Sequence, residues 1–161
     1  MPVTVREYLE SDLPFVERSY AEYLEEERRR VPQLGLPDDF AATYLPRLLA
    51  KVRDEGGLFL VAVDEELRVG YAAALPKEPQ AWDQTRAKVV MIMDLYVVPG
   101  RRRSGIGRAL FDAIEQRYAA EGFEWVTLGM MANNESARAF YEARGYRPTY
   151  LFLGKSLHPR R

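Results

Sequence analysis

The chain has 161 residues, of which 47% are hydrophobic and 29% are charged, and its formal net charge is −1. This length and composition suit one globular α/β domain spanning residues 1–161. The near-neutral charge gives no general attraction for nucleic acid or for an anionic membrane surface, so we expect neither as a partner.

The chain contains no cysteine, which excludes disulfides, thiolate metal sites and a cysteine nucleophile. No group of histidine, aspartate and glutamate has the spacing of metal ligands, so no metal site is predicted. No apolar run reaches the roughly 18 residues of a membrane span, and the first residues lack the profile of a signal peptide. We therefore expect a cytoplasmic protein.

The first half of the chain predicts two helices that follow a short strand. Val3–Leu9 alternates like a strand, and Ser11–Arg30 has the pattern of a helix. A second helix is expected from Asp38 to Gly57, with a kink or a split at Pro46. Leu58–Pro76 then predicts two apolar strands around a tight turn.

The second half predicts alternating strands and helices. A strand is expected over Lys88–Pro99, and a helix that ends at Gly122 follows it. Four apolar residues recur every fourth position in that helix: Ile106, Leu110, Ile114 and Tyr118. A strand over Phe123–Met131, a short helix capped by asparagine and a last strand over Arg147–Leu157 complete the chain. This order of elements indicates a single α/β sandwich with a mixed sheet.

The segment GRRRSGIGRAL, Gly100–Leu110, joins the predicted strand to the predicted helix. Unpaired N–H groups at the start of a helix and the helix dipole both favour an anion. Gly105 and Gly107 allow a phosphate to approach the backbone closely, and the consecutive arginines add positive charge. The spacing alone supports a phosphate site and a solvated basic turn about equally.

Two familiar phosphate-binding loops do not fit this segment. Gly100 and Gly105 have the spacing of a nucleotide P-loop, but Ile106 and Gly107 stand where lysine and serine or threonine are needed. The dinucleotide fingerprint fails as well, because Leu110 occupies its third glycine position. The loop therefore fits neither the motif of an NTPase nor that of a Rossmann-type dinucleotide site.

A second stretch, NNESARAFYEARGY, places Asn134, Ala137 and Tyr141 on one side of a short helix. With it, the chain resembles the GNAT superfamily of N-acetyltransferases. The loop is similar to the family's acetyl-CoA motif R/Q-x-x-G-x-G/A, and NxxAxxxYxxxGY is similar to the segment that follows that motif in the family. The resemblance is clear over Val89–Leu153, whereas the first 75 residues agree only in element order.

The resemblance implies a GNAT-like three-layer α/β fold. The expected sheet is mixed, has about six to seven strands flanked by about four helices, and is splayed between its fourth and fifth strands. The splay would free the end of the fourth strand, so that its backbone pairs with the pantetheine amides of acetyl-CoA like an additional strand.

The resemblance also implies the residues that bind acetyl-CoA as the co-substrate. Backbone N–H groups from Arg102 to Arg108 are expected to hold its pyrophosphate, and Asn134 to contact its pantetheine arm. The motif positions Arg102, Gly105 and Gly107 define the loop, while Arg101 and Arg103 are possible bystanders. The predicted cofactor-binding residues are Leu95, Tyr96, Val97, Arg102, Arg103, Ser104, Gly105, Ile106, Gly107, Arg108, Asn134 and Tyr141.

Two residues are candidates for proton transfer. Tyr141 matches the family's tyrosine that protonates the departing thiolate, although packing against the sheet would also explain a tyrosine there. Asp94 lies on the strand where many members carry a basic carboxylate. The polyamine enzymes of the family have an acidic pair here, and Met93 replaces its first member. Strand alternation predicts that Met93 and Asp94 face opposite sides, which leaves a structural role for Asp94 at least as good an interpretation.

The residues expected to bind the acceptor amine carry a weaker sequence signal than those expected to bind acetyl-CoA. The acidic run from Glu22 to Glu27 would attract a cationic amine, but Glu25–Arg29 and Glu26–Arg30 at i,i+4 spacing favour a solvated face. Three aromatic residues either line an acceptor cavity or belong to the core: Tyr23, Tyr44 and Trp82.

The sequence thus predicts an enzyme that transfers an acetyl group from acetyl-CoA to a primary amine of a small molecule or a peptide. Direct attack in a ternary complex is expected, since no covalent nucleophile is evident. The alternatives are an acyl-CoA sensor without turnover, a protein N-terminal or lysine acetyltransferase, and an interaction domain whose basic turn binds an acidic partner. Family members often form homodimers, so a homodimer is also an open alternative.

Overall fold

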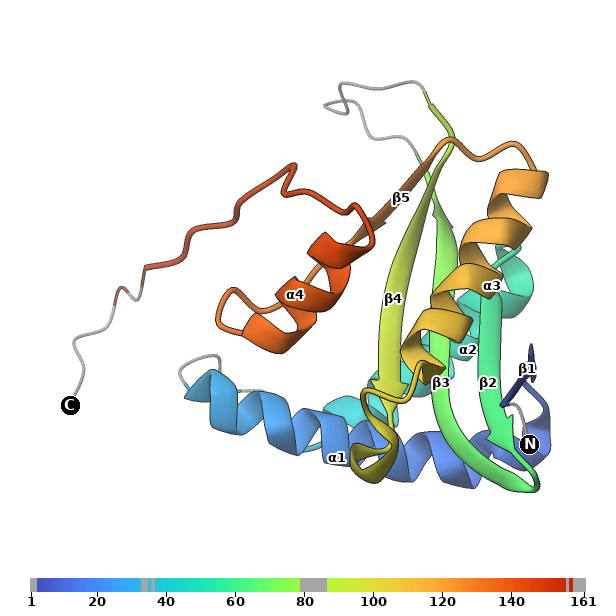
Figure 1. Ribbon diagram of the computed structural model, residues 1–161. Coiled ribbons are helices and arrows are strands. Elements are labelled where there is room, and N and C mark those ends of the chain that lie inside the picture. Colours follow the sequence, from blue (N-terminus) through green and yellow to red (C-terminus); the bar gives the residue numbers. More distant parts are fainter. Residues whose placement is uncertain (1–2, 33–34, 36, 79–86, 156, 158–161) are drawn as a thin grey trace. The chain divides into compact units, whose positions relative to one another are not determined.

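A computed structural model describes residues 3–32, 35, 37–78, 87–155 and 157. The chain divides into two compact units, Met1–Gly129 and Met130–Arg161. Figure 1 shows the course of the chain and labels its helices and strands. Among the described residues, no helix is both long enough and apolar enough to cross a membrane.

The first unit is built on a mixed sheet of five strands in the order β1-β2-β3-β4-β5. The first four strands are antiparallel neighbours, and β4 pairs with β5 in parallel. The strands are β1 (Thr4–Glu7), β2 (Leu58–Asp64), β3 (Leu67–Lys77), β4 (Val89–Val97) and β5 (Trp125–Leu128). The helices of this unit are α1 (Leu13–Arg30), α2 (Phe40–Asp54) and α3 (Ile106–Ala120).

Helices cover both faces of this sheet (Figure 1). The main buried cluster joins α1 and α2 to one face, with Tyr20, Leu48, Tyr71 and Tyr96 among its members. Helix α3 packs on the other face, and the four residues of its predicted apolar stripe are all buried, at 3% exposure or less. The predicted stripe is therefore confirmed. Pro46 lies inside α2, which continues through it as one helix.

A β-bulge interrupts the pairing of β3 with β4. Asp94 lies opposite Ala73 and Ile92 lies opposite Ala74, so Met93 has no partner residue across the ladder. Such an extra residue reverses the alternation of side chains beyond it. Met93 packs against the cluster on the α1 and α2 side, and Asp94 contacts α2 on that same side. The prediction that Met93 and Asp94 face opposite sides is therefore wrong, because it assumed an unbroken strand.

Strands β4 and β5 separate half-way along β4. Their parallel ladder runs only from Val89 with Trp125 to Ile92 with Leu128. Beyond Ile92, β4 pairs with β3 alone, so one edge of its last five residues carries no strand partner among the described residues. The expected splay between the fourth and fifth strands is present.

The second unit contains α4 (Glu135–Ala143), whose N-cap is Asn134. The predicted strand over 147–157 is wrong for residues 147–155 and 157, which form neither a strand nor a helix. Tyr150, Leu151, Phe152 and Leu153 are 67–96% exposed. An apolar run becomes a strand only when another strand supplies its hydrogen bonds, and the sequence does not show that partner. The described residues therefore form five strands, fewer than the expected six or seven.

Candidate functional site

The loop between β4 and α3 has a constrained backbone. A short 3-10 helix, η3 (Pro99–Arg101), ends the strand region, and α3 begins at Ile106. Gly105 is the N-cap of α3 with φ 89°, in the left-handed region, and Arg103 has φ 63°. A side chain on Gly105 would meet no atom within 4 Å, so glycine is needed there for its backbone conformation and not for lack of space.

Six consecutive N–H groups in this loop are open. The Arg102 N–H donates to the Pro99 carbonyl at 3.3 Å, and the next donor along the chain is the Ala109 N–H, to the Gly105 carbonyl at 2.9 Å. Between them, the N–H groups of residues 103–108 donate to no acceptor within the described part of the chain. A row of unpaired donors at a helix N-terminus is suited to an anion.

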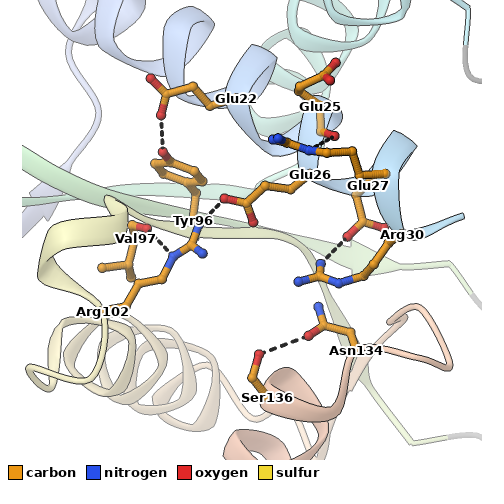
Figure 2. A network of polar contacts seen from close by, with 11 residues as sticks. Glu22, Glu25, Glu26, Glu27, Arg30, Tyr96, Val97, Arg102, Asn134 and Ser136 are labelled. Carbon is orange, nitrogen blue, oxygen red and sulfur yellow. Dashed lines mark hydrogen bonds and ion pairs between the residues drawn. The ribbon is translucent and has the colours of Figure 1, made fainter.

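The three consecutive arginines of the loop have different partners. Arg101 forms an ion pair with Asp64, the last residue of β2. Arg102 donates through Nη2 to Glu26 of α1 at 2.7 Å and through Nε to the Val97 carbonyl at 3.1 Å (Figure 2). Arg103 is exposed and forms no ion pair or hydrogen bond with any described residue. The guanidinium available to an incoming anion is therefore that of Arg103.

Helix α1 is bound to the end of β4 through two of its glutamates. Besides the Glu26–Arg102 pair, the Tyr96 hydroxyl donates to Glu22 Oε2 at 2.5 Å (Figure 2). The Arg102 guanidinium carbon also lies 5.9 Å from the centre of the Tyr96 ring. Burial, and then the bond to Glu22, raise the pKa of Tyr96 above its usual range, so it stays a neutral donor.

The expected i,i+4 pairs on α1 are not formed. The Glu25 carboxylate faces Arg28 at 3.9 Å instead of Arg29, whose Nε donates to the Glu25 carbonyl. Glu26 pairs with Arg102 and not with Arg30. Glu22 is exposed, as a solvated face predicts, whereas Glu27 is buried at 3% exposure, so the prediction is wrong for Glu27. Glu22 and Glu26 also contact partners about 75 residues away in sequence, which no local spacing rule includes.

Asp94 lies just beyond the bulge, half-buried beneath α1 and α2. Its Oδ2 accepts a hydrogen bond from the Tyr44 hydroxyl at 2.9 Å. Burial raises the pKa of Asp94 to about 6, and the bond from Tyr44 acts in the opposite direction because it stabilises the carboxylate. A carboxyl group with this pKa is largely ionised at neutral pH and still able to accept a proton.

Asn134 and Tyr141 belong to the second unit. The Asn134 Oδ1 accepts from the Ala137 N–H at 3.2 Å and from the Ser136 hydroxyl at 3.1 Å, so Asn134 acts as the helix cap. Tyr141 is half-buried, with its ring centre 5.4 Å from that of Phe140 and 6.0 Å from that of Tyr146. Burial raises the pKa of Tyr141 to about 12, which keeps its hydroxyl protonated.

The model of the acetyltransferase (GNAT) family matches residues 14–146. The chain belongs to this GNAT family. The match contains the open loop and β4, and it extends from the first compact unit into the second.

Relatives of this GNAT chain include enzymes and solved structures. Human N-acetyltransferase 8 is 34% identical over 97 residues, which are 60% of this chain but only 41% of the human protein. The crystal structure of a mutant of the BH1408 protein from Bacillus halodurans superposes with a TM-score of 0.86 at 27% identity, covering 96% of this chain and 99% of that one.

A more distant fold relative is the aminoglycoside acetyltransferase AAC(6′)-Iy, solved with a bisubstrate analogue of CoA and acetylneamine. Its TM-score is 0.74 at 16% identity, and the match covers 99% of this chain and 100% of that one. At this identity the likeness shows the GNAT fold alone.

In the first unit of the GNAT chain, the structure places Asp94, the free edge of β4 and the open loop in succession along the second half of β4 and just beyond it. The Arg102–Glu26, Tyr96–Glu22 and Tyr44–Asp94 contacts were not foreseen, because each joins residues 50 or more positions apart. Tyr44 was a candidate only as an acceptor-lining or core residue. Trp82, named with it, lies outside the described residues.

Proposed function

We propose that this chain transfers the acetyl group of acetyl-CoA to a primary amine of a small molecule or peptide, by direct attack within a ternary complex. The observation that carries the proposal is the row of open N–H groups over residues 103–108, at the N-terminus of α3 and beside the free edge of β4. Membership of the GNAT family supports acetyl-CoA as the molecule whose pyrophosphate binds to these groups. The same membership supports a single catalytic domain over residues 1–161.

The donor binds along the loop and β4. The N–H groups of residues 103–108 hold the pyrophosphate, and the helix dipole of α3 favours its charge. Arg103 adds a charge-assisted contact, whereas the Arg102 guanidinium stays on Glu26 and its N–H on the Pro99 carbonyl, so the proposed row of donors begins at Arg103. The backbone of Leu95–Val97 pairs with the pantetheine amides as an added strand would. Asn134 contacts the pantetheine arm as well as capping α4.

The chemistry requires proton transfers around one acyl transfer. The nitrogen lone pair of the amine attacks the acetyl carbonyl carbon, the C–N bond forms, and the C–S bond then breaks to release the CoA thiolate. A lysine-like amine has a pKa of about 10.4, so at neutral pH almost all of it is ammonium and must first lose a proton. The attacking nitrogen must also lose a second proton before the neutral amide forms, and the thiolate that leaves must gain one.

Asp94 and Tyr141 are suited to these transfers. Asp94, with a pKa of about 6, accepts the proton of the ammonium. Tyr141, with a pKa of about 12, is fully protonated at neutral pH and donates to the departing thiolate, and its phenolate then regains a proton from the attacking nitrogen. The environments of the two groups thus set their pKa values apart, so that each has the protonation state its role needs.

A thiol-release assay over a panel of amines tests the proposal. The panel contains aminosugars, polyamines, arylalkylamines and peptides with free N-termini, each with acetyl-CoA. We expect release with at least one class, and Tyr141→Phe should lower kcat by about 10²–10⁴-fold without changing the affinity for acetyl-CoA. Tyr146→Phe, a neighbouring tyrosine in the same unit, is the matched control and should keep its rate.

Two results would contradict the proposal in different ways. Acetyl-CoA binding without thiol release for any amine would make the chain a sensor of the cofactor. An unchanged rate in Tyr141→Phe would remove Tyr141 as the acid and leave the transfer itself standing.

A further inference from the structure

We propose that Tyr44 is a positioning residue for Asp94: its hydroxyl holds Oδ2, so that Oδ1 is the atom that receives the proton of the acceptor amine. This inference rests on the proposed role of Asp94 as the base. It adds a residue on α2 to the machinery and fixes the geometry of the proton transfer.

The Tyr44 ring is held in place from both sides. It stacks on Tyr20 of α1 with ring centres 5.1 Å apart at an interplanar angle of 12°. It also stacks on Phe40 of α2, with ring centres 5.5 Å apart at 13°. A ring clamped between two others has little freedom in its side-chain torsions, so its hydroxyl points to a fixed place. That place is Oδ2 of Asp94, at 2.9 Å.

The bulge brings the carboxylate to this hydroxyl. In an unbroken strand, a residue following Met93 would face the α3 side of the sheet. Because Met93 is the extra residue, Asp94 turns to the side covered by α1 and α2. The bulge and the clamped ring together determine which oxygen of Asp94 is occupied and which is left for another donor.

The hydrogen bond from the Tyr44 hydroxyl is the main polar interaction of the Asp94 carboxylate. The titratable groups that face it are Tyr20 from α1, Tyr44 from α2 and Tyr71 from β3. No lysine, arginine or second carboxylate among the described residues contributes to its titration. Burial raises the pKa of Asp94, and the Tyr44 bond lowers it. Tyr44 itself stays protonated, since burial and the Asp94 charge raise its own pKa.

The proton transfer is balanced within this arrangement. One N–H bond of the ammonium breaks, its electron pair stays on nitrogen as the attacking lone pair, and the proton moves to Oδ1. The carboxyl group becomes neutral while Oδ2 keeps the hydrogen bond from Tyr44. After the transfer, Asp94 returns the proton to solvent.

Carbon-13 NMR of the aspartate side chains measures the Asp94 pKa without any substrate. Asp94→Asn assigns the signal, and Tyr44→Phe removes the hydroxyl while keeping the ring between Tyr20 and Phe40. We expect Tyr44→Phe to raise the pKa of Asp94 by about one unit, because a hydrogen bond to a charged group is lost. Tyr20→Phe is the matched control, since no hydrogen bond joins Tyr20 to Asp94 among the described residues, and it should shift the pKa far less.

The pH profile of kcat/KM gives the second readout, with the best amine of the panel. In the wild type, the acid limb should lie near the pKa of Asp94, about 6. In Tyr44→Phe it should move up by about one unit, which lowers kcat/KM about fivefold at pH 6 and hardly changes it at pH 8. A role in packing alone would lower the rate equally at all pH values.

The two variants distinguish the failure of this inference from that of the proposed function. If Asp94→Asn keeps the rate and the acid limb, Asp94 is not the base and the proposed mechanism fails with the inference. If Asp94→Asn removes the limb but Tyr44→Phe leaves the Asp94 pKa and the profile unchanged, only the positioning role of Tyr44 is overturned.

Discussion

The loop between β4 and α3 follows the end of β4, whereas the bulge at Met93 lies at the middle of that strand, and the two are built by different kinds of interaction. The loop is made of neighbours in sequence: a left-handed Gly105, a helix start at Ile106 and the open donors of residues 103–108. The bulge site is made of distant residues, since the Asp94 carboxylate meets a hydroxyl 50 positions away. The loop is formed by the backbone conformation of a local segment, whereas the bulge site is formed by side-chain contacts between distant residues.

The two regions also differ in how much they reduce the free energy of unfolding. The side chains of the loop are mostly exposed, so its unpaired groups remain hydrated. Asp94 is shielded by aromatic rings, and its raised pKa shows that its charged form is disfavoured in the folded state. The comparison therefore predicts that the charged Asp94 at the bulge lowers the free energy of unfolding, and that the loop does not.

The largest expected effect follows from that difference. A carboxyl group with a raised pKa in the folded state contributes stability below its unfolded pKa of about 4 and loses it as the pH rises through about 6. Asp94→Asn stays neutral throughout. We expect it to be more stable than the wild type by about 2 kcal/mol at pH 7.5 and equal to it at pH 4, as measured by urea unfolding.

The control for this prediction is Glu66→Gln, which changes an exposed carboxylate in the β2–β3 turn. It should show no comparable dependence on pH. A variant of Asp94 that is less stable at pH 7.5, or a difference that does not change with pH, would show that the charge of Asp94 carries no cost.

A smaller effect is expected at the loop, on binding. Gly105→Val places a β-branched residue at φ 89°, which is strained although nothing lies within 4 Å of the new Cβ. The backbone must leave the left-handed region, and the row of N–H groups moves with it. We expect the affinity for acetyl-CoA, measured by calorimetry, to fall about tenfold.

Gly100→Val is the matched control for this prediction, because it lies in the same loop with equally open space but without a positive φ. Its affinity should stay close to that of the wild type. Equal losses in the two variants would mean that bulk near the loop, and not the conformation of Gly105, governs binding.

Sequence patterns predicted the elements whose signals are local. The stripe of Ile106 and Leu110 defined α3, and glycine spacing defined the loop. The bulge at Met93 was missed because a one-residue change of register follows from the pairing with β3 and leaves no mark on β4 alone. The exposed run Tyr150–Leu153 has the propensity of a strand, but strand pairing requires a partner that the sequence does not show.

The same distinction applies to the candidate site. Asn134 as a cap and the loop as a helix start could be predicted from a few neighbouring residues. The partners of Arg102 and Asp94 could not, since each comes from a helix that precedes them by 50 or more residues. Local rules thus indicate the proposed site for the donor, whereas the proposed acceptor side depends on how α1 and α2 pack on the sheet.

The central claim is that the open loop holds the pyrophosphate of coenzyme A. Parallel calorimetric titrations with acetyl-CoA and with acetyl-pantetheine, which lacks the nucleotide and its pyrophosphate, test it most directly. The account predicts that acetyl-CoA binds at least about tenfold more tightly, because only it has a group for the donors of residues 103–108. Equal affinities for the two molecules, or no binding of acetyl-CoA, would contradict it.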